Sequence, residues 1–257
     1  WGVILNTESQ KFGNIHNHSL TPRWTMQTIA ERLETAHAEI ASATAKSHRP
    51  SNSVKLLAVS KTKPVSDIIA AYEAGQRLFG ENYVQEGVDK VQELSHLSDI
   101  EWHMIGPIQS NKTKIVAEHF HWVQSVSREK IARRLNDQRP PHLPPLNVCI
   151  QLNIDDEQSK SGMNKEEFGY LAQLIEGLPR LVLRGIMAIP KANPSTQEQQ
   201  ETLSALKEIF DQYHTSLSNF DTLSVGMSND MQEAIYHGST MVRIGTAIFG
   251  QRNDTTA

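Results

Sequence analysis

Short apolar segments alternate with amphipathic segments along most of this chain. From Val54 onward, eight runs rich in β-branched and other apolar residues have the length of strands. They span residues 54–62, 78–83, 101–106, 122–126, 147–153, 183–189, 222–228 and 241–250. Several of these runs are almost continuously apolar, which is typical of parallel strands that are covered on both faces. The pattern therefore predicts eight mostly buried, parallel strands.

The segments between these runs have the spacing of amphipathic helices. They span residues 65–75, 86–94, 110–120, 128–138, 165–178, 195–217 and 229–238. A further helix is predicted from Met26 to Lys46, because Ile29, Leu33, Ala36 and Ile40 recur every three or four residues.

Eight β-α units in about 200 residues indicate an α/β protein with a closed (β/α)8 TIM barrel, preceded by an extra N-terminal helix. An open, doubly wound sheet is the alternative. The absence of a GxGxxG sequence after the first strand argues against it. We expect one domain over residues 26–257. Residues 1–25, which are polar and lack periodicity, are expected to be a disordered extension, with Met26 as a natural start.

Composition narrows the function classes. The 257 residues carry a net charge of -4, which gives no basic footprint for nucleic acid or an anionic membrane. The mean hydropathy is -0.44, and no apolar run approaches the length of a membrane span. The single cysteine, Cys149, excludes an internal disulfide and CxxC metal ligation. His16 and His18 have no third ligand at suitable spacing, so no metal site is predicted. We expect a cytoplasmic protein.

In barrels of this type, chemistry is located at the carboxyl ends of the strands. Lys61 follows the first strand on the side shared by Leu57 and Val59. An unpaired lysine in such a layer favours the neutral amine, the form that condenses with a carbonyl group. The alternative is that Lys61 extends past the strand into solvent. Lys63 is expected to be exposed at the rim.

The ends of the seventh and eighth strands carry groups suited to phosphate. Ser228 and Asn229 are predicted at the start of the following helix, where Ser228 could alternatively be a simple N-cap. Gly245 would let an anion approach the backbone, and Thr246 adds a hydroxyl. Arg243 needs an acceptor, either a ring nitrogen or a carboxylate. An amine opposite a phosphate site fits a pyridoxal phosphate protein or a class I aldolase.

Seven segments resemble the signature blocks of the pyridoxal phosphate homeostasis protein family. They are AVSKTKP, FGENYVQE, EWHMIGPIQSNK, SKSGM, LRGIMAIP, SVGMSNDMQEAI and STMVRIGTAIFG, in this order from residue 58 to residue 250. This family is related to the barrel domain of alanine racemase, the type III fold of pyridoxal phosphate proteins. The resemblance covers residues 26–252 and makes the aldolase interpretation the weaker one.

The resemblance also implies roles for individual residues. Lys61 would hold pyridoxal 5'-phosphate as an internal aldimine, and Asn82 and Met187 would line the pocket beside its ring. Arg243 would face the pyridine nitrogen. The phosphate would be bound by a serine, a glycine and a threonine, namely Ser228, Gly245 and Thr246. An arginine at the ring nitrogen keeps that nitrogen unprotonated, which weakens the ring as an electron sink.

Two functions remain open. In the first, the protein is a non-catalytic carrier that regulates free pyridoxal phosphate and can supply apo-enzymes that need it. In the second, it is a racemase-like enzyme. Racemisation requires a proton acceptor and a proton donor on opposite faces. Alanine racemases place the second group beside an additional domain, whereas few residues follow the eighth strand here. We therefore expect a monomeric carrier without catalytic residues, and we interpret His103 and Cys149 as core residues.

Overall fold

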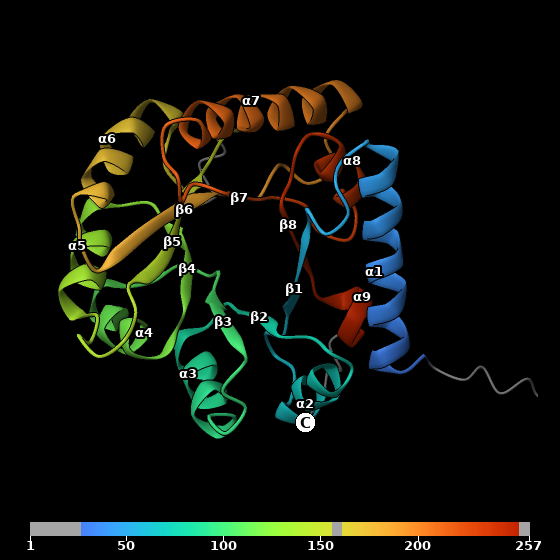
Figure 1. Ribbon diagram of the computed structural model, residues 1–257, viewed down its shortest axis with the longest axis horizontal. Coiled ribbons are helices and arrows are strands. Elements are labelled where there is room, and N and C mark those ends of the chain that lie inside the picture. The colour runs from blue at the N-terminus through green and yellow to red at the C-terminus, as the bar shows by residue number, and fades with distance from the viewer. Residues whose placement is uncertain (1–26, 156–160, 252–257) are drawn as a thin grey trace, which may run out of the picture.

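The eight predicted strands form a closed barrel in the computed structural model, which describes residues 27–155 and 161–251 (Figure 1). Neighbouring strands are parallel and follow chain order, and β1 also pairs with β8, with Leu57 opposite Arg243. This closure excludes the open-sheet alternative. The strands are β1 Lys55–Val59, β2 Leu78–Glu81, β3 Glu101–Met104, β4 Trp122–Val126, β5 Leu146–Leu152, β6 Leu181–Ala188, β7 Thr222–Ser224 and β8 Met241–Ile244.

Helices surround the barrel, as the alternating sequence pattern predicted (Figure 1). They are α1 Ile29–Lys46, α2 Val65–Glu73, α3 Val84–Glu93, α4 Thr113–His119, α5 Glu129–Gln138, α6 Lys165–Glu176, α7 Thr196–His214, α8 Met231–Tyr236 and α9 Thr246–Phe249, with a 3-10 turn at Ser110–Lys112 before α4. The additional helix α1 lies alongside α8 and α9. Its apolar face, which includes Leu33, Ala36 and Ile40, is buried there.

Two helix starts show how local sequence sets the boundaries. Thr28 precedes α1 and accepts a hydrogen bond from the amide of Glu31, whose carboxylate accepts from the amide of Thr28. Ser195 and Glu198 form the same capping box before α7. Each box satisfies amide groups that have no partner within the helix.

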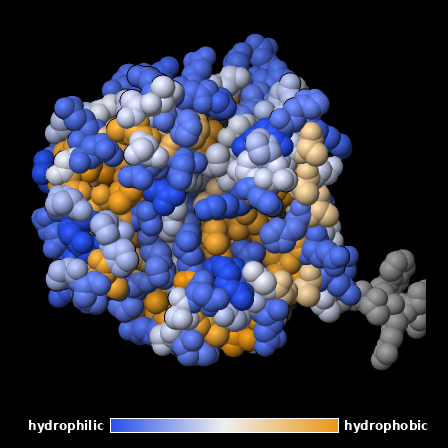
Figure 2. Space-filling view, in the orientation of Figure 1, coloured by the Kyte–Doolittle hydropathy of each residue, from blue (hydrophilic) through white to orange (hydrophobic). Residues whose placement is uncertain are grey.

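The strands are covered on both faces, as their sequences predicted. All five residues of β4 are buried, and so are six of the seven residues of β5. On the face drawn in Figure 2, hydrophilic residues prevail on the protruding parts of the surface. Hydrophobic ones lie in the recesses between them. No helix in the described ranges is long and apolar enough to cross a bilayer.

Several predicted boundaries were wrong. β1 ends at Val59, not at residue 62, and β7 ends at Ser224, not at residue 228. The apolar run 241–250 is not one strand, because β8 ends at Ile244 and residues 246–249 form the short helix α9. The helix after β7 begins at Met231 with Asp230 as its N-cap residue, so Ser228 is not the N-cap. The expectations for residues 1–25, including His16 and His18, lie outside the described residues.

Candidate functional site

All seven residues predicted for cofactor binding line one cavity at the carboxyl ends of the strands. The cavity has a volume of about 600 Å³, which suits a small organic molecule. Its lining comes from residues in or directly after six strands. It comprises Val59, Lys61, Asn82, Ile105, Met187, Ile189, Met227, Ser228, Asn229, Arg243, Gly245, Thr246 and Ala247. The barrel therefore brings together residues that are up to 188 positions apart (59 to 247).

Lys61 is half-buried in the turn that follows β1. Within the described residues its amine makes no hydrogen bond or ion pair, whereas the backbone on both sides is held. The carbonyl of Ser60 accepts a hydrogen bond from Lys90 Nζ at 2.8 Å, and the amide of Thr62 donates to Glu86 Oε1 at 2.6 Å. Thr62 has a φ of 62°, a left-handed conformation that is uncommon for threonine. The amine is thus available on a fixed backbone.

Lys63 is not the exposed rim residue that the sequence suggested. Its side chain is half-buried, and Nζ donates to the carbonyl oxygens of Gly250 and Gln251, at 2.9 Å each. These bonds connect the loop after β1 to the end of α9. Lys63 is therefore engaged in structure, in contrast to Lys61.

Arg243 is almost completely buried in the cavity wall, with 4% of its surface exposed. Its Nη1 donates to the carbonyl and the hydroxyl of Ser224, at 2.8 Å each, and Nη2 donates to the carbonyl of Ala188 at 2.9 Å. No carboxylate among the described residues pairs with it. Burial lowers the pKa of Arg243 to about 10, which leaves the guanidinium cationic at neutral pH. The acceptors are thus neutral oxygens, and the positive charge remains directed at the cavity.

Asn82 and Met187 give the cavity a polar and an apolar part of its wall, respectively. The side-chain oxygen of Asn82 is buried and has no hydrogen-bond partner within the described part of the chain. Such an atom is costly unless a ligand or water satisfies it. Met187 is fully buried and packs with Trp122 and Cys149 in the barrel interior. The cavity therefore has an apolar wall and an unsatisfied polar atom.

The groups predicted for phosphate lie together beyond β7 and β8. Ser228 and Thr246 are exposed, Gly245 is half-buried, and all three line the cavity with Asn229. The glycine has an additional structural reason, because a Cβ at this position would lie 3.3 Å from the carbonyl oxygen of Val59. A side chain there would press on β1.

His103 and Cys149 are core residues, as interpreted from the sequence. Both are fully buried, and burial raises the pKa of the Cys149 thiol. Four apolar lining residues beyond the strand ends were not predicted from the sequence: Ile105, Ile189, Met227 and Ala247. Their position just beyond a strand end was a usable signal, but apolar side chains there do not stand out from the core pattern.

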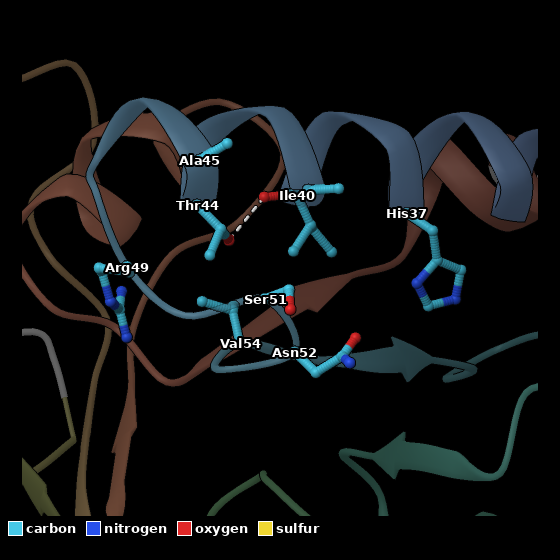
Figure 3. Close-up of a pocket in the computed structure, with 9 residues that line it drawn as sticks. His37, Ile40, Thr44, Ala45, Arg49, Ser51, Asn52 and Val54 are labelled. Atoms are coloured by element: carbon cyan, nitrogen blue, oxygen red, sulfur yellow. Dashed lines mark hydrogen bonds between the residues drawn. The ribbon is translucent and has the colours of Figure 1, made fainter.

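A second recess lies between α1 and the segment that leads into β1 (Figure 3). It has a volume of about 340 Å³. In its wall Thr44 Oγ1 donates to the carbonyl of Ile40, and Arg49 Nη1 donates to the carbonyls of Ile235 and Ser239. These bonds serve the helix and the loop. Because the recess lies at the amino end of β1, the cavity at the carboxyl ends is the candidate site. The described ranges contain no group of three or more potential metal-binding His, Cys, Asp or Glu residues.

The chain is similar to the N-terminal domain of alanine racemase and to pyridoxal phosphate homeostasis proteins. Residues 35–253 match the family model for the N-terminal domain of alanine racemase. The pyridoxal phosphate homeostasis protein of Haemophilus influenzae is 55% identical over 235 residues, covering 90% of this chain and 96% of that protein. The protein of the same name from Escherichia coli K12 is 53% identical over 230 residues, covering 89% of this chain and 98% of that protein.

Solved structures show the same relationship. PipY of Synechococcus elongatus, solved with PLP bound, has a TM-score of 0.72 and 34% identity, covering 87% of this chain and all of PipY. Alanine racemase from Corynebacterium glutamicum has a TM-score of 0.62 at 16% identity, covering 87% of this chain and 63% of that one. The second likeness extends to the fold alone.

Proposed function

The chain belongs to the pyridoxal phosphate homeostasis protein family, and from this membership we propose that it binds pyridoxal 5'-phosphate and regulates its free level. The observation that carries the proposal is the cavity itself. It combines the amine of Lys61, which has no partner among the described residues, with a buried guanidinium and a group of hydroxyls in a space of about 600 Å³. The orphaned oxygen of Asn82 is a further sign that the cavity is built for a polar ligand.

Lys61 is the residue that attaches the cofactor. When bound, pyridoxal phosphate supplies an aldehyde and a ring that can accept electrons. The amine of Lys61 would hold the cofactor covalently by condensing with that aldehyde. Lys63 cannot take this role without breaking its bonds to Gly250 and Gln251.

The other lining residues bind and orient the cofactor. Arg243 would face the pyridine nitrogen of the bound cofactor, and because it is cationic it would keep that nitrogen unprotonated. Ser228, Gly245 and Thr246 bind the phosphate. Met187 would provide an apolar contact for the cofactor ring. Asn82 would lie beside the ring, where its side-chain oxygen, which has no partner among the described residues, can accept a hydrogen bond.

We further propose that the protein is a carrier and not a racemase. Among the described residues that line the cavity, Lys61 and Arg243 are the ionisable ones. The two candidates for a second base lie elsewhere: Tyr83 is half-exposed outside the lining, and both ring nitrogens of His103 are hydrogen-bonded. Racemisation needs a group on each face of the substrate. This supports a protein that holds the cofactor and releases it to apo-enzymes. The cytoplasmic location and the monomeric state remain part of the proposal.

Borohydride reduction tests the attachment. We expect a visible absorption band that disappears on reduction, with the cofactor then found by peptide mapping on Lys61. Lys61→Ala should lose the band and Lys63→Met, the matched control, should keep it. A band of full strength in Lys61→Ala would refute the assignment.

Turnover and transfer distinguish the carrier from the enzyme. Incubation with L-alanine, followed by chiral chromatography, should give no D-alanine above the slow background of an uncovered aldimine. Excess apo-enzyme should remove the cofactor. Racemisation at about one turnover per second, within the ordinary enzyme range, would establish the racemase alternative instead.

A further inference from the structure

A chain of buried polar side chains crosses the barrel from the cavity to the opposite end. It begins at Arg243, whose Nη1 lies 2.8 Å from Ser224 Oγ. Ser224 Oγ lies 2.6 Å from Gln124 Oε1, and Gln124 Nε2 lies 2.9 Å from His103 Nδ1. His103 Nε2 lies 2.7 Å from Glu101 Oε1, at the first residue of β3. Four strands thus contribute to one connected chain.

Every hydrogen bond in this chain points in the same direction. A guanidinium can only donate, so the hydroxyl of Ser224 accepts a hydrogen bond from Arg243. The same hydroxyl donates a hydrogen bond to the side-chain oxygen of Gln124. The NH2 group of Gln124 then faces His103 Nδ1, which must accept. The ring proton is therefore on Nε2, which donates to Glu101. The chain runs from a cation to an anion, an arrangement in which each bond polarises the next.

The surroundings keep the chain fixed. Ser224, Gln124 and His103 are fully buried, in a barrel interior that is usually filled by Val, Ile and Leu. Burial lowers the pKa of His103, which favours the neutral ring that the chain requires. Trp122 stacks on that ring with centroids 4.9 Å apart and planes 15° apart. Buried polar groups of this kind rigidify a core when all of them are satisfied.

We propose that this chain is a positioning device for Arg243, with Ser224, Gln124 and His103 as its positioning residues. The inference rests on the proposed function, in which Arg243 faces the cofactor ring. Gln124 acts through Ser224. Its side-chain oxygen accepts the hydrogen bond of the Ser224 hydroxyl, so the lone pairs of the hydroxyl oxygen are directed at the guanidinium. The anion, Glu101, is three intervening side chains away, so it does not neutralise the charge that faces the cavity.

The test uses Ser224→Ala and Gln124→Leu in the full chain, with Ser239→Ala as the matched control. Ser239 is also a fully buried serine, but its hydroxyl donates to backbone carbonyls, and its side chain is not part of the hydrogen-bonded series from Arg243 to Glu101. We expect both variants to trap pyridoxal phosphate on Lys61. Ser224→Ala, which removes the hydroxyl bond to the guanidinium, should bind it about tenfold more weakly, the effect of one lost hydrogen bond to a charged group. Gln124→Leu keeps that bond and removes only the acceptor of the Ser224 hydroxyl, so it should weaken binding by a smaller factor.

The pH dependence of the visible band is the discriminating measurement, because a substitution that only destabilises the fold would leave it unchanged. Ser224→Ala leaves Arg243 its bonds to the carbonyls of Ser224 and Ala188 but removes the hydroxyl that fixes Nη1. With the guanidinium less firmly directed at the ring nitrogen, that nitrogen gains a proton at higher pH, so the midpoint of the profile should shift upward in both variants. Ser224→Thr, which keeps the hydroxyl, should titrate like the unmodified protein. Ser239→Ala should lower the melting temperature without changing affinity or profile.

The outcomes separate this inference from the proposed function. If Ser224→Ala and Gln124→Leu melt earlier but bind and titrate like the unmodified protein, the chain only fills the core and the inference fails. If Gln124→Leu does not fold, Ser224→Ala, which removes one oxygen atom, decides the question alone. Failure of the unmodified protein to trap the cofactor on Lys61 would instead overturn the proposed function.

Discussion

Lys90→Met tests how strongly a buried ion pair supports the backbone next to Lys61. Lys90 Nζ lies 2.8 Å from Glu81 Oε1 and 2.7 Å from Glu86 Oε1. The side chains of Lys90 and Glu81 are 7% and 0% exposed. The same amine donates to the carbonyl of Ser60 at 2.8 Å, one residue before Lys61. Methionine keeps the length and removes the charge together with all three hydrogen bonds.

The expected loss in the free energy of unfolding follows from the few partners that Glu81 would keep. Glu81 would keep only its bond from the Ser60 hydroxyl at 2.7 Å, and its second oxygen already has no partner among the described residues. Removing one member of a buried ion pair costs about 3–5 kcal/mol, because the other charge stays buried alone. We therefore expect the free energy of unfolding to fall by about 3 kcal/mol or more at pH 7.5.

The loss should depend on pH in a defined direction. Burial, which outweighs the opposing effect of Lys90, raises the pKa of Glu81 above its ordinary value of 4.5. Without Lys90 this pKa rises further. A carboxyl group whose pKa is higher in the folded state stabilises that state below the unfolded pKa. This contribution is lost as the pH rises through the folded pKa. The penalty of Lys90→Met should thus shrink on acidification toward pH 5 and grow toward pH 7.5.

Urea unfolding, followed by tryptophan fluorescence at pH 5.5 and 7.5, measures both effects. Lys114→Met is the control, since Lys114 is 73% exposed and lies 4.0 Å from Glu118 in a surface pair of the kind that contributes little. The double variant Lys90→Met/Glu81→Leu should recover most of the loss. A loss in Lys90→Met no greater than that in Lys114→Met, or one independent of pH, would refute the reasoning.

Three further predictions concern other parts of the chain. Gly106→Ala should cost about 1–3 kcal/mol and weaken cofactor binding, because its Cβ would lie 2.1 Å from the carbonyl oxygen of Asn82; thermal unfolding and cofactor titration measure the two effects. Arg139→Met should lower the melting temperature, because this buried guanidinium donates to three backbone carbonyls; an unchanged melting temperature would contradict this. Deletion of residues 1–25 should leave cofactor binding and melting temperature unchanged, since a polar segment without periodicity buries little; a drop of several degrees would show otherwise.

Much of the fold could be read from the sequence because its determinants are local. Nearly continuous apolar runs specify strands buried on both faces, and eight of them with intervening helices specify a closed barrel. The positions of Lys61, Asn82 and Arg243 could also be anticipated. The carboxyl ends of parallel strands meet on one face, so polar residues there converge whatever the details of packing.

Other features depended on tertiary structure. The run 241–250 is apolar except for Arg243 and Thr246, so its composition does not mark the point where β8 ends and α9 begins. The fixed backbone around Lys61 requires Lys90 and Glu86 from α3, and no spacing rule connects them to the first strand.

The chain from Arg243 to Glu101 shows the limit most clearly. The two-residue period of strands indicates that Gln124 and Ser224 each face the same side as the residues two positions away in their own strands. It does not indicate that the two side chains touch. They are 100 residues apart and hydrogen-bond at 2.6 Å. Which inward side chains meet across a barrel is set by strand tilt and stagger, properties of the closed sheet as a whole. The sequence alone indicated the polar residues that reach the cavity from the strand ends, and the closed barrel determined its apolar wall and what holds these residues in place.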